Sequence, residues 1–580
     1  MGLGVLDDRK LDHVPGTTYV LDDDSSSIEQ IPSETSHLKY DRSGPVPIIL
    51  VPQPSDEPND PLNWPLWRRD LILTILSLIS VICATTSPLM AANTVTIAAE
   101  FERTFTDIAL LTGYHLCAVG VAGFLFVPTA RIWGKRHLFL LGNVIIIFSC
   151  AWAGASGTNY KSLLAARIFQ GIGLAPFEAL VNAAVGDLYF VHERGKRMAV
   201  SNVALFGGAF LTPVLVGKIT ASMGWAWTFN FVAIFAGLCL PFVFFFVPET
   251  AFRRATHLNT DFEGDAERNR NPRDVRYQEE MSNGTSDHSG SGTNGELQTD
   301  GKSDSANEKE MKEDTAITGT AGQPGAAKAT FLQSLRLFNG RKTDEDFFKL
   351  LLRPLPLFFH LGILWGCLIQ GVIIGWTVFI GVVLAALFLG PPLWFNEVKT
   401  GYLYTGAFVG SLLGLILSGL LSDWSARVMI KFNRGKYEPE FRIVLVFPML
   451  IFSCAGLYGF GYISGDITRY GWLPADIFFA LVIIGMVLGA VASALYLVDA
   501  HRQIAVEAFT CLLVFKNMFS FVLTYFAYDW VVHGGQKQVF IIIASIQVGI
   551  CLLSVPMYIL GKRNRSFFHR HDILKILHLW

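Results

Sequence analysis

Two charged residues inside an apolar stretch are the first candidates for chemistry. Arg167 and Glu178 fall in a run long enough to cross a bilayer, where a charged side chain costs at least about 2.5 kcal/mol. We interpret Glu178 as the best candidate for a titrating group and Arg167 as its modulator. Their spacing puts both on one face of an ideal helix, about 16 Å apart, although Pro176 between them can bend it. Alternatively, Arg167 extends to the membrane surface and Glu178 is structural.

Other polar residues also lie within apolar runs. Gln170 is one helical turn after Arg167, and His115 has a reference pKa suited to proton exchange, although a hydrogen-bonded structural histidine is the simpler reading. Lys516 and Asn517 are adjacent in a later run. Lys516 could gate charge or neutralise a carboxylate such as Glu178, or it could be a packing residue satisfied by backbone carbonyls.

The elements that must position these residues follow from composition. The chain has 580 residues, of which 51% are hydrophobic and 16% charged, which is typical of a polytopic membrane protein. Apolar runs of membrane-spanning length predict helices at 70–91, 108–129, 137–156, 161–184, 198–221 and 227–247, then at 356–384, 401–422, 441–461, 474–498, 505–530 and 538–560. We therefore predict an all-α membrane protein with twelve transmembrane helices in two six-helix bundles.

Polar segments surround these helices. Residues 1–66 are predicted to be a disordered cytosolic tail, 67–250 the first bundle, 251–355 a largely disordered cytosolic linker, 356–562 the second bundle, and 563–580 a cytosolic tail. Lys and Arg gather in alternate loops, which predicts that both termini are cytosolic. Short segments before residue 356, FLQSLRLF and FFKLLLRP, could lie flat at the membrane surface or simply lead into the next helix.

Several motifs resemble the major facilitator superfamily, specifically its fungal twelve-helix branch described as drug:proton antiporters. They are RIFQGIG from Arg167, the GDLYF…ERGKR loop from Gly186, PETAFR from Pro248, and NRGKYEPEFR from Asn433. The last is similar to a signature of a subgroup that includes yeast polyamine and organic-cation carriers. The resemblance implies two pseudo-symmetric bundles that alternate access to a central site, and proton coupling through the helix that carries Arg167.

The stretch GAFLTPVLVG resembles the antiporter motif of this branch. Gly208, Pro213 and Gly217 keep its small residues and its proline, which allow close packing and a bend, and Thr212 stands where the motif has glycine. The departure weakens the inference of export. A structural bend is the more ordinary reading of these residues than a ligand contact.

A gate at the cytosolic side is implied by the loops after the second helix of each bundle. Arg131 falls where the family has an acidic residue, whereas Asp423 and Arg427 are in register with the family motif. The cluster of Asp187, Glu193 and Arg194 offers other partners, so we expect Asp187 or Glu193 to help close the gate.

The function that we predict is secondary transport of a small organic molecule, driven by protons, without a cofactor, a metal or enzymatic activity. The eight cysteines are scattered singly, and no phosphate-binding loop, HExxH or GxSxG motif occurs, nor a nucleic-acid-binding pattern. Export of a drug or secondary metabolite by a monomer in the plasma membrane is the first expectation. The alternatives are uptake of polyamines or organic cations, and a membrane sensor that does not transport.

Overall fold

The computed structural model describes residues 3–8, 10, 14, 16–19, 39–41, 48–50, 52–254, 328–389, 393–433 and 436–580. The chain divides into two compact units. The first, the helical unit, comprises Met1–Ser33, Pro65–Phe252 and Thr330–Trp580. The second, the polar unit, comprises Glu34–Trp64 and Arg253–Ala329. Each is described by itself.

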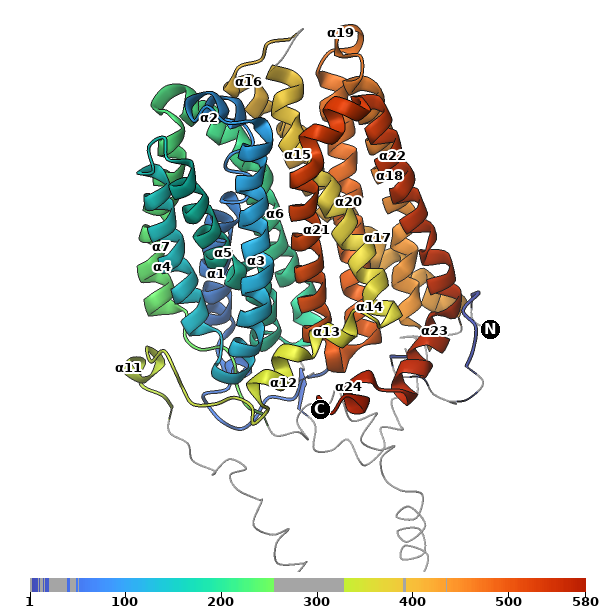
Figure 1. Cartoon of the computed structure of the whole chain (residues 1–580). Helices are drawn as coiled ribbons and strands as arrows, with labels where there is room; N and C mark the ends of the chain where they lie inside the picture. The colour runs from blue at the N-terminus through green and yellow to red at the C-terminus, as the bar shows by residue number, and fades with distance from the viewer. Residues whose placement is uncertain are drawn as a thin grey trace, which may run out of the picture. The chain divides into compact units, whose positions relative to one another are not determined.

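The first half of the helical unit contains six long helices and one short one. They are α1 Leu66–Thr85, α2 Thr94–Glu100, α3 Phe105–Trp133, α4 Arg136–Gly154, α5 Tyr160–Leu188, α6 Val191–Met223 and α7 Trp225–Phe246. All but the short α2 run the length of the bundle (Figure 1). Four of the long helices, α3, α5, α6 and α7, contain an internal proline, and Pro176 and Pro213 lie inside helices as predicted.

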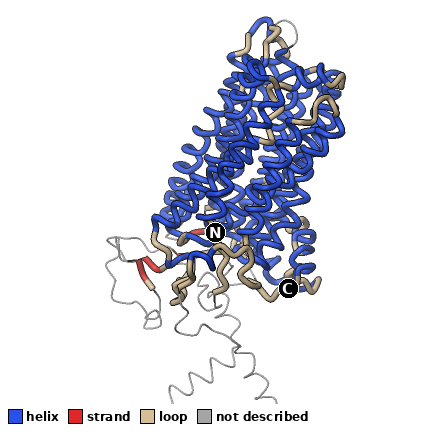
Figure 2. The backbone as a smooth tube through the Cα atoms, turned by 90° about the vertical axis from the view of Figure 1, so that its left-hand side faces the viewer, coloured by secondary structure: helices blue, strands red, loops and turns tan. Residues whose placement is uncertain are grey.

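The second half repeats this arrangement with more interruptions. Its helices are α14 Leu361–Gly366, a π-helical turn η5 at Cys367–Gly371, α15 Val372–Leu389, α16 Glu397–Tyr402, α17 Thr405–Phe432, a 3-10 turn η6 at Pro439–Leu445, α18 Val446–Ser464, α19 Ile467–Tyr470, α20 Leu473–Ala500, α21 Ala505–Gly534, α22 Gln536–Leu552, α23 Ser554–Arg570 and α24 Ile573–Ile576. Helices make up nearly the whole of the bundle, and both termini lie at one end of it, which we call the terminal end; the opposite end is the distal end (Figure 2).

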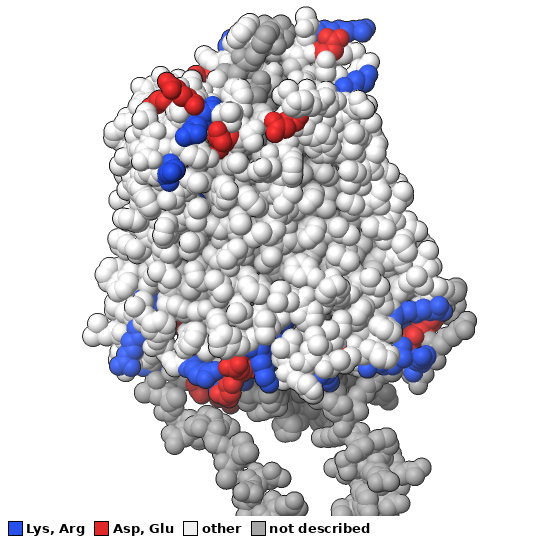
Figure 3. Space-filling model, viewed as in Figure 1, with Lys and Arg blue, Asp and Glu red and all other residues white. Residues whose placement is uncertain are grey.

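The predicted twelve-helix membrane fold is confirmed. Eleven helical stretches of the described chain are long and apolar enough to cross a membrane. Helix α1 is the twelfth; its 20 residues pack against α6 and α7, and Arg68, Arg69 and Asp70 place three charges near its start. A broad band of uncharged side chains crosses the face seen in Figure 3, with charged groups at both ends, as a lipid-embedded surface requires.

Close helix contacts hold α5 in place. A Cβ atom built on Gly171 would lie 2.2 Å from the backbone oxygen of His115, and one on Gly173 would lie 2.9 Å from Ile146 Cγ1. Only glycine permits such approaches to α3 and α4. The glycines of RIFQGIG are therefore packing residues that bring the polar side chains of α5 against neighbouring helices.

The N-terminal segment is more ordered than predicted. Val5 and Val14 are buried, and strand β1 (Thr18–Tyr19) pairs antiparallel with β4 (Lys436–Tyr437). Thr17 Oγ1 donates to Glu438 Oε2 at 2.7 Å. The prediction of a disordered tail is wrong for these residues, because they fold by docking on the second half and not alone. Most of residues 20–51 lie outside the described residues.

The linker and the C-terminal end also depart from expectation. Residues 255–327 lie outside the described residues, but the stretch after them forms α11 (Phe331–Ser334), α12 (Phe347–Leu352) and α13 (Pro354–Leu357). Both segments singled out before residue 356 therefore contain short helices. The segment predicted as a cytosolic tail at 563–580 is largely helical, because α23 (Ser554–Arg570) continues into it and α24 (Ile573–Ile576) follows.

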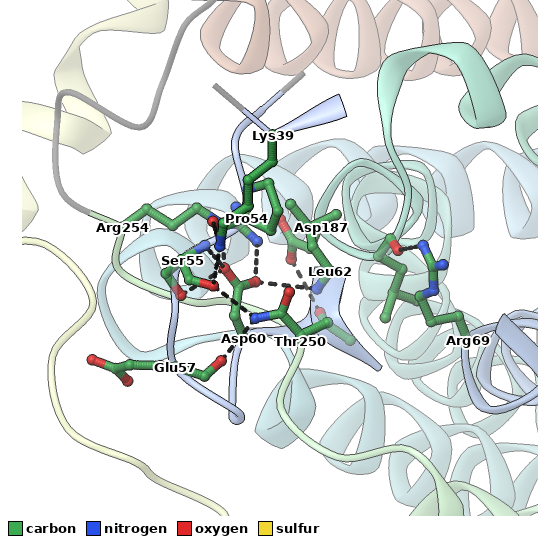
Figure 4. A network of polar contacts seen from close by, with 12 residues as sticks. Lys39, Pro54, Ser55, Glu57, Asp60, Leu62, Arg69, Asp187, Thr250 and Arg254 are labelled. Atoms are coloured by element: carbon green, nitrogen blue, oxygen red, sulfur yellow. Dashed lines mark hydrogen bonds and ion pairs between the residues drawn. The ribbon is translucent and has the colours of Figure 1, made fainter. Parts of the chain in front are cut away.

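The polar unit is organised around Asp60. Its carboxylate pairs with Arg254, at 2.7 Å from Nη2, and accepts from the backbone N–H groups of Ser55 and Leu62 (Figure 4). Burial alone would raise the pKa of Asp60, but these donors and the Arg254 charge lower it overall. A 3-10 turn, η2 (Pro61–Asn63), and one strand pair, β2 (Tyr40–Asp41) with β3 (Ile48–Ile49), complete its described part.

Candidate functional site: a cavity between the two halves

A cavity of about 200 Å³ lies between the two halves of the helical unit. Residues of α1, α3, α5 and α6 line one side, and residues of α15, α20 and α21, with Tyr404 just before α17, line the other. Most are apolar, and five carry aromatic rings: Phe206, Phe210, Tyr404, Phe479 and Tyr528. A concave, mainly apolar site with a few polar groups is the usual form of a small-molecule site.

An ion pair crosses this cavity. Glu178 on α5 accepts a hydrogen bond from Lys516 on α21, and the two side chains are 15% and 13% exposed. Among the described lining residues they are the charged ones. The structure thus brings together two candidates that the sequence could only list separately. Because both side chains are mostly buried, removal of either charge would leave the other without a counter-ion, which is energetically costly.

Asn517 and Ser520 continue the polar strip of α21 along the cavity wall. The Asn517 side-chain nitrogen donates to Leu513 O at 3.0 Å, and Ser520 Oγ donates to Lys516 O at 2.7 Å. Thr112 and Thr377 add hydroxyl groups from α3 and α15. The site therefore offers one ion pair and several neutral hydrogen-bonding groups among apolar walls.

Arg167 lies in a second, separate cluster. It is fully buried, and its guanidinium donates to Thr86 O at 2.6 Å, to Ser87 O at 3.4 Å and to Gln170 Oε1 at 2.8 Å. It does not extend to the membrane surface. Since α1 ends at Thr85, Arg167 satisfies carbonyls that the helix leaves unpaired and places a positive charge at its C-terminal end.

His115 and Gln170 complete the Arg167 cluster. His115 Nδ1 lies 3.2 Å from Arg167 O and its Nε2 lies 3.1 Å from Ser87 Oγ, while Gln170 Nε2 donates to Ser149 O at 3.4 Å. None of Arg167, Gln170 and His115 lines the cavity, but Ser87 does. The Arg167 cluster therefore borders the cavity through Ser87, just after the end of α1.

The antiporter-like residues lie at the contact between α6 and two other helices. A Cβ on Gly208 would lie 3.0 Å from Val81 Cγ1 of α1, and one on Gly217 would lie 2.4 Å from Glu397 O of α16. Thr212 Oγ1 donates to Gly208 O at 2.7 Å, and Pro213 O lies close to Gly401. Their neighbours Ala209 and Phe210 line the cavity, whereas these four do not.

At the terminal end, Arg131 of α3 contacts the second half. It forms ion pairs with Glu507 of α21 and with Glu345, whose Oε2 is 3.4 Å from Arg131 Nε. Arg353 Nη2 lies 2.8 Å from Glu345 Oε1, and Arg353 Nη1 lies 3.6 Å from Glu507 Oε1. The positive residue at position 131 is thus matched by an acid on the facing helix.

The predicted gate partners behave differently. Asp187 pairs with Lys135 at 2.5 Å and accepts from Thr250 Oγ1 at 3.1 Å, while Glu193 pairs with Arg69 at 3.1 Å. The prediction that Asp187 or Glu193 closes the gate is wrong for this structure, because all these contacts stay within the first half. Arg69 also donates to Leu188 O at 3.0 Å. Figure 4 labels Arg69, Asp187 and Thr250 in the same view.

Asp423 and Arg427 form no hydrogen bond or ion pair with the first half in the described part of the chain. Asp423 and Arg427 are exposed on α17, and Arg427 Nε donates to the backbone oxygen of Asp423 in its own helix at 3.2 Å. Arg194 belongs to α6, and its side chain lies outside the described residues. Agreement with the family motif at 423 and 427 therefore did not identify the pair that joins the halves.

Two residues of the charged cluster were missed from sequence. Glu345 and Arg353 lie in the stretch that composition assigned to the linker. The available signal was the sequence DEDFFKLLLR, in which charges flank an apolar run directly before a membrane helix. Among the described residues, no group of three or more His, Cys, Asp or Glu side chains could hold a metal ion.

A family model described as Major Facilitator Superfamily matches residues 73–503. The chain belongs to this superfamily. An uncharacterized MFS-type transporter of Schizosaccharomyces pombe is 24% identical over 97% of this chain and 94% of its own length, and Protein HOL1 of Saccharomyces cerevisiae is 25% identical over 96% of each. The MFS transporter cpaT of Aspergillus oryzae is 23% identical over 88% of this chain and 90% of its own.

Solved structures agree on the fold. The proton:xylose symporter XylE superposes with a TM-score of 0.53 at 14% identity, over 85% of this chain and 96% of that chain. The family match and the full-length similarity to MFS-type transporters make the protein an integral, multi-pass membrane transporter of this superfamily and not an enzyme. Its fungal relatives support the fungal branch that the motifs indicated.

Proposed function

We propose that this protein is a proton-coupled transporter that exports a small organic molecule, such as a drug or secondary metabolite, through the cavity between its halves. The observation that carries the proposal is the ion pair of Glu178 and Lys516. It joins α5 to α21 inside the cavity, so its charge state acts at once on the site and on the contact between the halves.

Glu178 is the group that takes up and releases the proton. Protonation removes its negative charge, ends its attraction for Lys516 and weakens one contact across the cavity. A proton that binds one access state more tightly than the other shifts the population toward that state, which is the requirement for coupling. The Arg167 cluster supports this step by holding the end of α1, and with it Ser87 and Pro88, against α5.

The cavity wall supports a largely apolar substrate. Aliphatic and aromatic side chains dominate it, and its neutral polar groups can orient a molecule by hydrogen bonds. Relatives named for metabolite clusters, such as the citrinin biosynthesis cluster transporter mrr1 of Monascus ruber, 22% identical over 88% of this chain, support export. We place the protein in the plasma membrane with both termini in the cytosol, where the basic loops would favour them.

Uptake of an organic cation is the second candidate. Glu178 is the acidic residue among the described lining residues, and aromatic rings such as Phe206 and Phe479 can contact a cation face-on. The full-length similarity to HOL1, together with the YEPEFR sequence, favours this reading within the transporter class.

The test is flux in cells or vesicles that carry the protein, with and without a protonophore. We expect gradient-dependent movement that Glu178→Gln abolishes while the protein stays folded in the membrane. Glu102→Gln, which neutralises an exposed acid of the first half, is the matched control and should keep wild-type flux. The direction of substrate movement across the membrane distinguishes export from uptake.

No gradient-dependent flux of any tested compound by the wild-type protein would favour a membrane sensor. Undiminished coupling in the Glu178→Gln variant would instead show that the proton is carried elsewhere.

A further inference from the structure

Four charged side chains at the terminal end form a closed ring of alternating sign. Arg131 contacts Glu507 and Glu345, and Arg353 contacts the same two acids. Three separate elements contribute: α3 of the first half, α21 of the second half, and the segment that leads from Glu345 to α13. Each carboxylate therefore has two cations, one from each half.

The two arginines differ in how they are held. The Arg353 side chain is 1% exposed, its Nε donates to Leu579 O at 2.8 Å, and its guanidinium lies 4.7 Å from the centre of the Trp580 ring. The Arg131 side chain is 33% exposed, and among the described residues it forms ion pairs with the two acids. Arg353 is fixed to the second half, whereas Arg131 moves with α3.

Glu507 is the residue for which this difference matters. The Glu507 side chain is 5% exposed. If Arg131 were its only cation, separation of the halves would leave the buried Glu507 carboxylate without a counter-ion, at a high energetic cost. Arg353 remains beside it when Arg131 leaves. Glu345 is 29% exposed, so solvent screens its charge when Arg131 leaves, and its contact with Arg353 is the shorter of its two.

We infer that Arg353 is a positioning residue that makes the gate reversible: it is the permanent counter-ion of Glu507 and Glu345, and Arg131 is the one member of the ring that leaves when the terminal end opens. The stretch from Glu345 to Arg353 is then part of the gate and does more than connect the two halves. This inference rests on the proposed alternating movement of the halves.

The test compares two matched variants, Arg131→Gln and Arg353→Gln, in the full-length protein in lipid nanodiscs. Hydrogen–deuterium exchange over residues 126–134 and 503–512 reports opening of the terminal end without any substrate. Arg131→Gln should raise exchange roughly two- to fivefold, because a partly exposed contact between the halves is lost. Arg353→Gln should lower it by a similar factor, because Arg131 becomes the only remaining cation of Glu507 and opening becomes more costly.

Glu507→Gln supplies the control for misfolding. In that background the buried charge is gone, so adding Arg353→Gln should leave exchange unchanged, provided that the thermal midpoint shows a folded protein. Faster exchange in both single variants, or no change in Arg353→Gln, would overturn the inference. Opposite changes in exchange without gradient-driven flux would support this gate while removing the proposed transport function.

Discussion

The two ends of the contact between the halves are held by different physical means. At the distal end, α6 and α16 approach so closely that Cβ atoms on Gly217 and Gly401 would lie 2.4 Å from Glu397 O and 2.6 Å from Pro213 O. Thr96 Oγ1 adds one hydrogen bond to Glu397 Oε1, at 2.5 Å. At the terminal end the halves meet through the charged ring of Arg131, Glu345, Arg353 and Glu507.

These different contacts predict which substitutions and which salt concentrations each end should tolerate. Backbone contacts depend on shape, so they are sensitive to a single added carbon and insensitive to salt. Charged side chains are flexible, so they tolerate changes of volume but respond to salt and to loss of charge. Each prediction below tests one side of this contrast, in order of decreasing effect.

The largest effect is expected for Gly217→Ala. Its Cβ would meet a backbone oxygen that cannot rotate away, so we expect a loss of about 1–3 kcal/mol of stability from overpacking. Thermal unfolding in detergent would measure it. Gly237→Ala is the control, because a Cβ there has no neighbour within 4 Å. Equal midpoints for the two variants would contradict the shape-based contact.

Thr96→Val should have the next effect. The change keeps the side-chain volume and removes the hydrogen bond to Glu397, at a cost of about 1 kcal/mol. The same unfolding measurement applies, with Thr74→Val as the control, because Thr74 bonds only within its own helix in the described structure. A Thr96→Val variant as stable as the wild type would show that packing alone closes the distal end.

Arg131→Ala should cost less than about 1 kcal/mol, because its side chain is 33% exposed and solvent screens its ion pairs. We expect increased exchange at the terminal end and none at the distal end, measured by hydrogen–deuterium exchange of both. Increased exchange at both ends would mean that the two ends are not independent.

Salt should reproduce a weaker form of this effect. Raising the ionic strength from about 0.15 to 1 M shortens the screening length from about 8 to 3 Å. Exchange over residues 126–134 should rise modestly, and exchange over 213–221 should not change. If exchange rose only over residues 213–221, the distal end and not the terminal end would depend on charged contacts, which would contradict the contrast between the two ends.

The smallest effect concerns the N-terminal segment. Burial would raise the pKa of Glu438, but Thr17, Lys562 and Arg565 lower it overall below its ordinary value of 4.5. A depressed pKa stabilises the folded state above the unfolded value, and this contribution is lost as pH falls through the folded pKa. Protection of residues 3–8 should therefore weaken in acid, and Glu438→Gln should remove this dependence. Protection that is independent of pH in the wild type would contradict the role of Glu438.

The sequence predicted site features that depend on neighbouring residues, but it did not decide contacts between residues far apart in the chain. Glu178 and Lys516 were recognised as candidates because charge inside an apolar run is visible locally. Their pairing was one alternative among several, because they are 338 residues apart. The expectation for Asp187 and Glu193 failed because both acids have nearer cations in the first half.

The sequence by itself determined the twelve membrane helices, since apolar length is a local property that the bilayer selects. Glycine at 208 and 217 likewise indicated close packing before any partner was known. Only the tertiary structure decided that Arg131 meets Glu507, 376 residues away, and that Arg167 holds the end of α1 and does not line the cavity. These pairings depend on how helices rotate and pack against one another, which no single stretch of the chain encodes.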